Sequence, residues 1–510
     1  MSSGLAVQMQ DESLLAQLGY KQEFKRDFGV LELTGLVFSI QGVLPGIASV
    51  LVYSIPYGGA VSMVWGWGVC SIFLMFIATA IAELGSAVPT SGGVYYWIFQ
   101  FSSPSCRKYL SWLLGYIDTI AYIAGVTGIN WGCAVQIVAA ASIGTSESFQ
   151  ANVFQTYAVF VAVAVLQTVL CSFATRVIAK LQLVYMLINI GLCVGVIFGM
   201  PADTPVEFKN DARYAFGSFQ NSSLWPDGFA FILSFLAPLW VVGGFDSSVH
   251  VSEEARNAST AIPWAIILST AISCILGWAI NVSIAFNMGE DIDGILSNPI
   301  GQPLATIFFN SFNQRGTLAL WSIIIIAQFM AGTSFLVSSS RQVFAFSALP
   351  FSNTLYYVQG SSSVPLRCVW ASASVSILLG LIPLAGNAAS GAVFALAVVG
   401  QYICCSTAIM ARWLGGREFK KGPFHMGVLS LPISFCAVLF MMLMSVILLF
   451  PAEPNLSGPA TMNYTVLVIG SVIVFSTVYY FLPVYGGMNW FTGPVITAGR
   501  DDAITDSKSA

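Results

Sequence analysis

The sequence predicts an all-α polytopic membrane protein with twelve transmembrane helices, in which two inverted five-helix repeats are followed by two further helices. Three observations predict this fold. Charged residues make up 8% of the 510-residue chain and apolar residues 56%, whereas a soluble domain has about 25% charged residues. Apolar runs of about twenty residues, each long enough to cross a bilayer, recur along the chain. Two of these runs contain helix-breaking residues near the middle.

The predicted spans cover most of the chain. They lie at residues 29–52, 60–84, 111–143, 153–173, 177–199, 229–255, 262–287, 317–346, 366–384, 389–411, 427–450 and 463–485. The third and eighth are longer than a bilayer requires, which indicates tilt. The resulting divisions are a cytoplasmic N-terminal tail (1–28), a first five-helix repeat (29–199), an extracytoplasmic loop (200–228), a second inverted repeat (229–412), a cytoplasmic loop with the last two helices (413–485) and a cytoplasmic C-terminal tail (486–510).

The basic residues predict the orientation. With both termini in the cytoplasm, sixteen of the 19 Lys and Arg residues fall in cytoplasmic segments, and Lys209, Arg213 and Arg315 remain outside. This positive-inside bias supports an even number of spans. The first apolar run has full span length, unlike a cleavable signal peptide. We expect a multi-pass protein in a lipid bilayer, of the plasma membrane rather than the vacuolar membrane.

The polar residues argue against several classes of function. The net charge is −4 and no basic cluster exceeds a juxtamembrane anchor, so nucleic acid is not an expected partner. The ten cysteines are scattered and there are two histidines, which favours structural thiols over a metal or redox site. No nucleophile–base pair stands out. We expect no enzymatic activity, cofactor or metal, and the oligomeric state stays open.

The two interruptions fall in corresponding helices. The first span contains residues 39–46 (SIQGVLPG), and the sixth contains residues 243–248 (GGFDSS). These spans open the two five-helix units, and an odd number of spans inverts the second unit. Gly and Pro are frequent in membrane helices, but paired interruptions in inverted halves predict the substrate site of a secondary transporter.

The chemistry of such a site follows from helix dipoles. The half-helix that starts after Gly42 presents N–H groups that suit a carboxylate, and the carbonyl groups before Gly244 suit an ammonium group. The breaks could therefore bind both ends of a zwitterion. Asp246 holds the ammonium group, binds a proton or caps the second half-helix. A buried ionised Asp costs ~3 kcal/mol, so it is expected to face inward.

Other polar residues have competing interpretations. We expect three acids at cytoplasmic span ends to form a structural inner gate or loop clamp with neighbouring basic residues, rather than to contact the substrate. The acids are Glu83, Glu253 and Glu254, and the available partners are Arg107, Lys108, Arg256 and Arg341. Interhelical hydrogen bonding and substrate contact are the two roles open to Gln328, Gln401 and Tyr402. Phe245 lies in the break itself, which favours substrate contact.

Two motifs resemble those of a known superfamily. Residues 245–257 (FDSSVHVSEEARN), followed by Ile262 and Pro263, resemble the sixth-helix signature of the amino acid–polyamine–organocation superfamily. Residues 82–84 (AEL) and 88–97 (VPTSGGVYYW) resemble its second-helix signature.

Two further motifs narrow the resemblance. Residues 18–28 (LGYKQEFKRDF) and 338–347 (SSSRQVFAFS) are similar to the fungal amino acid/choline branch, in which the chain is most similar to γ-aminobutyrate (GABA) permeases. The likeness runs from about residue 15 to 485. It implies a LeuT-like fold with broken helices 1 and 6, and uptake coupled to H+.

The chain departs from this pattern at three places. Asn189 stands where proton-coupled bacterial relatives place a lysine, so the proton carrier stays open. Residues 347–350 (SALP) replace a longer segment that contains a basic residue. Asp118 occupies a third-helix position that is neutral in GABA permeases. Because no Lys or Arg in its span neutralises it, Asp118 carries the proton, faces the cationic end of the substrate or is wetted by a cytoplasmic vestibule.

These arguments define a predicted site and function. The predicted substrate-binding residues are Ser39, Gln41, Gly42, Val43, Gly243, Gly244, Phe245, Asp246, Asp118 and Gln328. The predicted function is proton-coupled import of a small amino acid or amine such as γ-aminobutyrate by alternating access. The alternatives are a choline or polyamine permease of the same fold, and a nutrient receptor that binds the ligand without transport.

Overall fold

The computed structural model describes Arg26 and residues 28–173, 175–347, 365–455, 458 and 462–494. The tails at 1–25 and 495–510 and the shortened segment around 348–350 therefore lie outside the described residues. Within them the regular secondary structure is helical, apart from two isolated β-bridges that join Phe28 to Ala255 and Tyr57 to Asn221.

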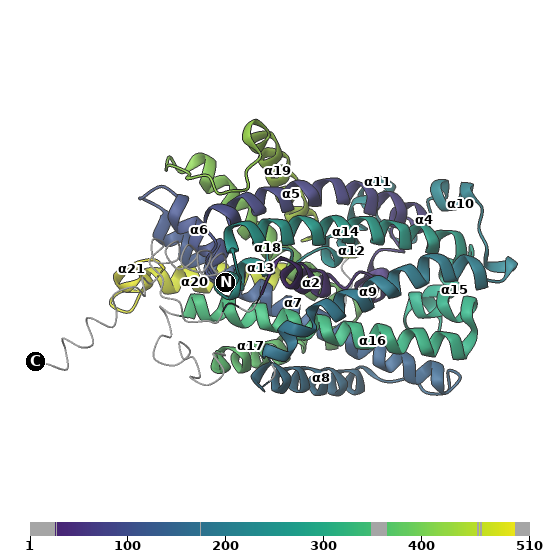
Figure 1. The fold of residues 1–510 in the computed structure, drawn as a ribbon. Helices are drawn as coiled ribbons and strands as arrows, with labels where there is room; N and C mark the ends of the chain where they lie inside the picture. The colour runs from purple at the N-terminus through teal and green to yellow at the C-terminus, as the bar shows by residue number, and fades with distance from the viewer. Residues whose placement is uncertain are drawn as a thin grey trace, which may run out of the picture.

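Eleven helical stretches among the described residues are long and apolar enough to cross a membrane. Figure 1 shows the bundle that they form. Their helices are α2 (Val30–Gln41) with α3 (Val43–Val50), α4 (Gly59–Val61) with α5 (Trp67–Ala87), α7 (Arg107–Gly144), α8 (Val153–Phe173), α9 (Thr175–Asp203), α14 (Ala258–Asn287), α16 (Pro303–Ser347), α17 (Leu366–Leu379), α18 (Asn387–Leu414), α19 (Ser430–Ile447) and α20 (Tyr464–Phe481).

The predicted sixth span is not among these eleven stretches. It is divided into α11 (Asp227–Leu233), α12 (Leu236–Val241) and α13 (Ser247–His250), each too short to cross a bilayer alone. The first span is divided at Gly42, between α2 and α3. The predicted all-α fold with broken helices 1 and 6 is thus confirmed.

The remaining short helices lie in the connections. They are α6 (Gly93–Phe101), α10 (Ala212–Gly217), α15 (Ile292–Ser297) and α21 (Gly487–Trp490). The predicted eighth span, 317–346, lies within the second part of α16, and Pro303 begins the part before it. Asn313 has φ 57° and ψ 178°, so α16 is two helices joined at a kink.

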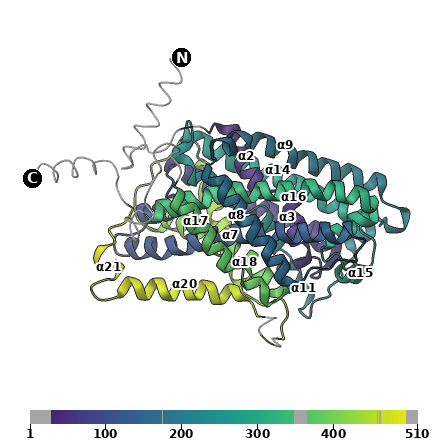
Figure 2. The same ribbon diagram turned by 90° about the horizontal axis from the view of Figure 1, so that it is seen from below.

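The helices divide into a central group and a periphery. α7 packs along α16 and α18, and α14 packs against α5 and α2. The apolar stretch that contains α2 is 94% buried, whereas that of α20 is 22% buried. Figure 2 shows α20 along one edge of the bundle. The broken first helix therefore lies in the interior, where irregular backbone is sheltered from lipid.

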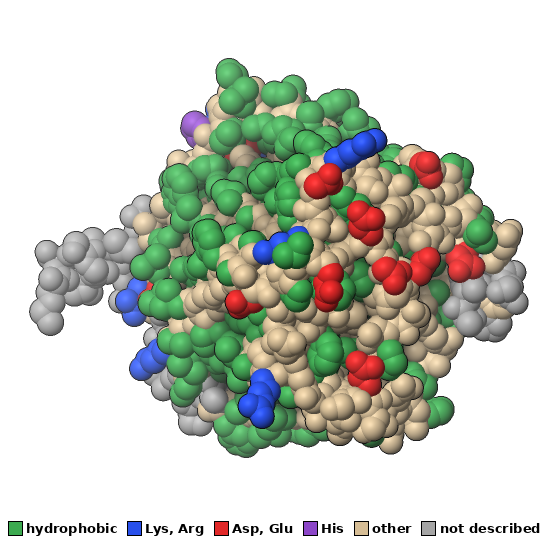
Figure 3. Space-filling model, turned by 90° about the vertical axis from the view of Figure 1, so that its right-hand side faces the viewer, with side chains coloured by type: hydrophobic (Ala, Val, Ile, Leu, Met, Phe, Trp, Pro, Cys, Tyr) green, Lys and Arg blue, Asp and Glu red, His purple; other side chains and the backbone are tan. Residues whose placement is uncertain are grey.

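The bundle has two distinct ends. α6 and α21 lie at one end and α10 and α15 at the other, which we call the α21 end and the α10 end (Figure 1). Acidic side chains are spread over the α10 end (Figure 3). The exposed acids in its loops and helix ends are Asp203, Glu207, Asp211, Asp227, Glu290, Asp291, Asp293 and Glu453.

A close contact between α14 and α5 yields a prediction of stability. A Cβ at Gly277 of α14 would lie 1.9 Å from Cζ2 of Trp67, and the Trp67 indole is held by donating to the Cys274 carbonyl at 3.1 Å. Gly277→Ala should therefore destabilise the protein by about 1–3 kcal/mol through overpacking. The readout is the thermal unfolding midpoint in detergent. Gly195→Ala, with no atom within 4 Å of the added Cβ, is the control, and equal midpoints for both variants would contradict this packing.

Candidate functional site

The first helix break is a single residue. Gly42 has φ 40° and ψ 65°, a left-handed conformation that glycine adopts without strain. Its N–H donates to the Phe38 carbonyl (3.0 Å), which closes α2, and its carbonyl accepts from the Gly46 N–H (2.6 Å) in the first turn of α3. A new helix therefore begins at Val43, with the positive end of its dipole at the break.

The second break is longer and lies against the first. Residues 242–246 connect α12 to α13 without forming a helix, and Gly244 has φ 69°. A Cβ at Gly244 would lie 3.0 Å from Cγ2 of Ile40 and 3.3 Å from Cε2 of Phe335. A larger residue is therefore disfavoured at Gly244 both by the backbone and by the close approach of α2.

Gln41 joins the two breaks directly. Its Nε2 donates to the Val242 carbonyl at 3.3 Å, and its Oε1 accepts from the Ser273 hydroxyl of α14 at 2.7 Å. Gln41 is 3% exposed. Its amide thus satisfies a carbonyl that the interruption of the sixth helix leaves without an intrahelical partner.

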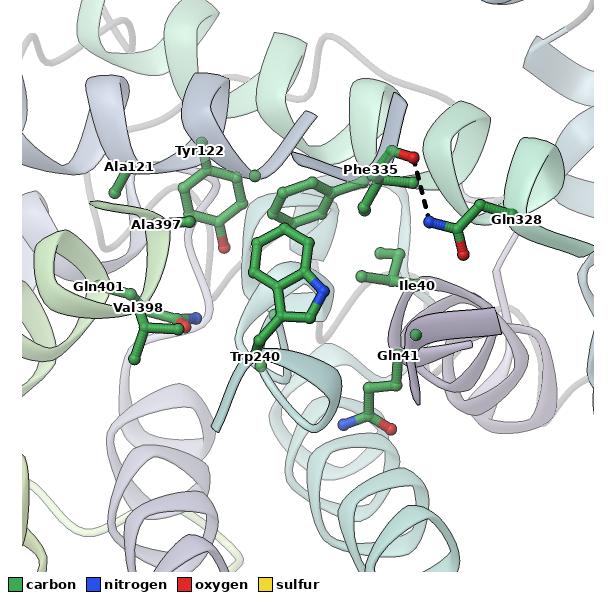
Figure 4. Close-up of a pocket in the computed structure, with 15 residues that line it drawn as sticks. Ile40, Gln41, Ala121, Tyr122, Trp240, Gln328, Phe335, Ala397, Val398 and Gln401 are labelled. Atoms are coloured by element: carbon green, nitrogen blue, oxygen red, sulfur yellow. Dashed lines mark hydrogen bonds between the residues drawn. The ribbon is translucent and has the colours of Figure 1, made fainter. Parts of the chain in front are cut away.

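A cavity of about 40 Å³ lies between the breaks. Gly243 and Gly244 contribute to its wall, and the side chains that line it are mainly amides and aromatic rings. They include Gln41, Gln328 and Gln401, with Tyr122, Trp240 and Phe335. Figure 4 shows the rings of Phe335 and Trp240 together, with Gln401 on one side and Gln41 and Gln328 on the other. The volume suits roughly three water molecules, so the cavity is nearly closed.

The predicted site residues occupy three positions relative to this cavity. Four of them line it: Gln41, Gly243, Gly244 and Gln328. Gly42 and Val43 follow Gln41 at the start of α3. Ser39, Phe245, Asp246 and Asp118 are buried and are not among the lining residues.

The amide side chains that line the cavity also form hydrogen bonds within the protein. Such bonds are the alternative to substrate contact for Gln328 and Gln401. Gln328 Nε2 donates to the Ile129 carbonyl of α7 at 3.0 Å. Gln401 Nε2 donates to Oδ1 of Asp246 at 2.6 Å. Asp246 directly precedes α13, but its carboxylate accepts no capping hydrogen bond. The Gln401 contact, rather than helix capping, therefore fixes the Asp246 side chain.

Two buried acids lie behind the cavity wall. Oδ2 of Asp118 accepts from Nε2 of Gln342 at 3.2 Å. The other carboxylate oxygen of Asp118 and that of Asp246 have no hydrogen-bond partner among the described residues. The two carboxylates repel each other when both are charged. Buried like charges favour binding of a proton or a cation.

Two ion pairs close the α21 end. Arg341 Nε bonds to Oε1 of Glu254 at 2.9 Å, as the inner-gate interpretation expects. Arg412 Nη1 bonds to Oε2 of Glu83 at 2.7 Å, a partner that was not among those considered from the sequence. Glu253 instead accepts a hydrogen bond from the Ser91 hydroxyl. The pairs join α16 to the segment after α13, and α18 to α5.

Backbone pairing adds to this closure. The Phe28 N–H donates to the Glu254 carbonyl (3.0 Å), and the Arg256 N–H donates to the Phe28 carbonyl (2.8 Å). Arg26 Nη1 donates to the Ala255 carbonyl at 2.6 Å. The residues before α2 are thus attached to the segment that follows the broken sixth helix.

The α10 end has a thinner barrier. The Trp240 ring packs edge-on against Phe394, with centroids 4.7 Å apart, and Phe394 contacts Tyr53 at 5.5 Å. Tyr53 also lines a second cavity of about 270 Å³. An aromatic layer therefore separates the central cavity from a larger vestibule.

That vestibule carries one acid among its described lining residues, Glu453. Burial, assisted by the Glu453 carboxylate, raises the pKa of Tyr57 to about 12. Tyr57 is therefore neutral at physiological pH, and the Glu453 carboxylate is the acidic group among the described residues that line this vestibule.

Sequence reasoning missed the three aromatic residues of the central cavity. Tyr122 lies one helical turn after Asp118, and this spacing places both side chains on one face of α7. Trp240 lies just before the second break, which is also a detectable signal. Phe335 is brought to the site by packing of α16 alone.

Comparisons with known proteins agree with this architecture. The chain matches the amino acid permease family over residues 28–473. It is 34% identical to the GABA-specific permease of Saccharomyces cerevisiae, over 98% of this chain and 88% of that protein. It is 36% identical to an uncharacterised amino-acid permease of Schizosaccharomyces pombe (97% and 90%) and 29% identical to amino-acid permease 2 of Neurospora crassa (96% and 90%). The resemblance inferred from the motifs is confirmed: the chain belongs to the amino acid permease family.

Proposed function

We propose that this permease imports a small zwitterionic amino acid such as γ-aminobutyrate together with protons, by alternating access. The observation that carries the proposal is the cavity enclosed by the two helix breaks, because it combines helix-end dipoles with neutral amide and aromatic walls. The similarity to a GABA-specific permease supports this substrate class.

The cavity offers a distinct surface to each end of a zwitterion. The α3 end of the first break suits a carboxylate, since N–H groups at a helix start lack intrahelical acceptors. The carbonyl end of α12 and the faces of Trp240, Phe335 and Tyr122 suit an ammonium group. Gln41 and Gln401 lie on opposite sides (Figure 4) and supply neutral hydrogen-bonding groups between these surfaces.

We further propose that Asp118 and Asp246 share the coupling proton. Both are buried behind the cavity wall, and the basic side chains of the α21-end pairs are already bonded to Glu83 and Glu254. Asn189 is buried and donates to the Tyr185 carbonyl at 3.0 Å. As an amide it carries no titratable proton, so a carboxylate pair is the better candidate for the proton carrier.

The distribution of Lys and Arg along the sequence supports a membrane orientation. We propose that the α21 end faces the cytoplasm and the acidic α10 end faces outward, in the plasma membrane. The closed α21 end and the vestibule at the α10 end then correspond to a nearly occluded, outward-oriented conformation.

Three aromatic rings also suit a quaternary ammonium ligand, so choline is the second candidate. Polyamines and binding without flux are further outcomes of the same test. That test is uptake of labelled γ-aminobutyrate, other amino acids, choline and polyamines into proteoliposomes with an imposed pH gradient. We expect electrophoretic, proton-driven accumulation of γ-aminobutyrate. Accumulation that requires sodium instead of a pH gradient, or preference for choline, would contradict the proposal.

The breaks provide the first variant test. Gly42→Val and Gly244→Val should abolish uptake while protein still reaches the membrane, because both glycines have positive φ and a β-branched residue restricts the backbone there. Gly195→Val is the control, since its Cβ meets no atom within 4 Å. The measurement is initial uptake normalised to reconstituted protein. Normal kinetics in both break variants would mean that the site lies elsewhere.

Substitution of Asp118 provides the second variant test. Asp118→Asn should leave substrate exchange intact and remove concentrative uptake, because it keeps the shape of the side chain and removes one carboxylate of the pair. Asp203→Asn, at an exposed acid, is the control. The assays are counterflow exchange and accumulation under a pH gradient. A higher Michaelis constant that is largest for dicationic amines would instead place Asp118 at the substrate, and unchanged behaviour in both assays would remove it from the mechanism.

A further inference from the structure

The buried histidine of α13 lies one helical turn after Asp246, which directly precedes that helix. His250 is 1% exposed, and its charge interacts with that of Asp246. Its ring meets the ring of Tyr122 edge-on, with centroids 4.7 Å apart. A Cβ at Gly93 would lie 2.8 Å from Cε1 of His250. The imidazole is therefore held in one orientation between α7 and the start of α6.

The hydrogen bonds of His250 fix its tautomer. Nδ1 lies 2.9 Å from the Ser91 carbonyl, which only accepts, so Nδ1 carries the proton. Nε2 is buried and has no hydrogen-bond partner among the described residues. In the neutral ring, an unpartnered Nε2 is a base with a free lone pair. A buried polar atom without a partner is costly for a purely structural role.

The surroundings connect this base to both sides. On one side, Tyr122 lines the cavity, and the charges of Asp246 and Asp118 act on Tyr122. Ser91 leads toward the α21 end, where its hydroxyl donates to Glu253. The elements packed against α13 are α2, α14, α16 and the 3-10 turn Ser252–Glu254. Their described buried residues contribute four titratable groups, which are Cys274, Arg341, Glu253 and Glu254. Arg341 is paired with Glu254, so it does not compete for the proton.

We propose that His250 is the relay through which the coupling proton leaves Asp118 and Asp246 for the α21 end, an inference that rests on the proton coupling proposed above. The proton passes from the carboxylic acid to Nε2, which leaves a carboxylate and an imidazolium. When the α21 end opens, the Nδ1 proton passes to water, which leaves the neutral ring with its proton on Nε2. Exchange of one proton at each ring nitrogen with water then restores the Nδ1–H tautomer before the next cycle. Each step moves protons only, and water is the only other reactant.

The test separates relay from packing. His250→Asn keeps an amide N–H donor close to the position of Nδ1 and removes the titratable ring. His425→Asn, at the exposed other histidine of the sequence, is the matched control. Purified variants are reconstituted with a pH-sensitive dye inside the liposomes. γ-Aminobutyrate-induced proton influx, accumulation under a pH gradient and counterflow exchange are then measured.

We expect His250→Asn to reduce proton influx and accumulation by at least about tenfold, to keep exchange within about twofold of the parent, and His425→Asn to match the parent. Unchanged proton influx in His250→Asn would overturn the relay. A loss of exchange as large as the loss of proton influx would also overturn it, because it would indicate a packing role for His250. If the parent accumulates substrate without proton influx, the proposed coupling itself fails, and the relay with it.

Discussion

The architecture depends on one constraint: backbone N–H and C=O groups inside a bilayer need partners. Helical hydrogen bonds satisfy it along most of the eleven membrane-length stretches of the described chain, one of which contains the first break. The two breaks satisfy it by different means. At Gly42 both backbone groups remain hydrogen-bonded, so the helix changes direction at little cost. At the second break the Gln41 side chain bonds to Val242. The interior position of α2 makes both solutions feasible.

The constraint explains which features could be predicted. Span lengths follow from hydrophobicity, and the breaks are visible because Gly42 and Gly244 are residues that adopt positive φ readily. The residues that line the cavity were harder to predict from the sequence, because they depend on how each helix is rotated about its axis. Phe245 shows this: it lies in the break, yet it is fully buried and does not line the cavity, whereas Trp240 does.

The ionisable groups are separated by depth. Bonded ion pairs lie at the α21 end, and the unneutralised carboxylates lie at the centre. The partner of Glu83 could not be read from the sequence, because Arg412 is 329 residues away and several basic residues were equally plausible. Asp118 was identifiable because a lone acid in a long apolar span is conspicuous whatever its contacts.

The Phe28 bridge has a mechanical consequence. It attaches the start of α2 to the end of the sixth-helix region, and Gln41 attaches the end of α2 to the second break. Residues 28–41 and 242–256 are thus joined at both ends, with the positive-φ glycine Gly42 directly after the first segment and Gly244 within the second. The two segments would then move as one rigid unit. Opening of the α21 end would replace the Arg341–Glu254 contact by contacts with water and leave the hydrogen bonds within the unit intact.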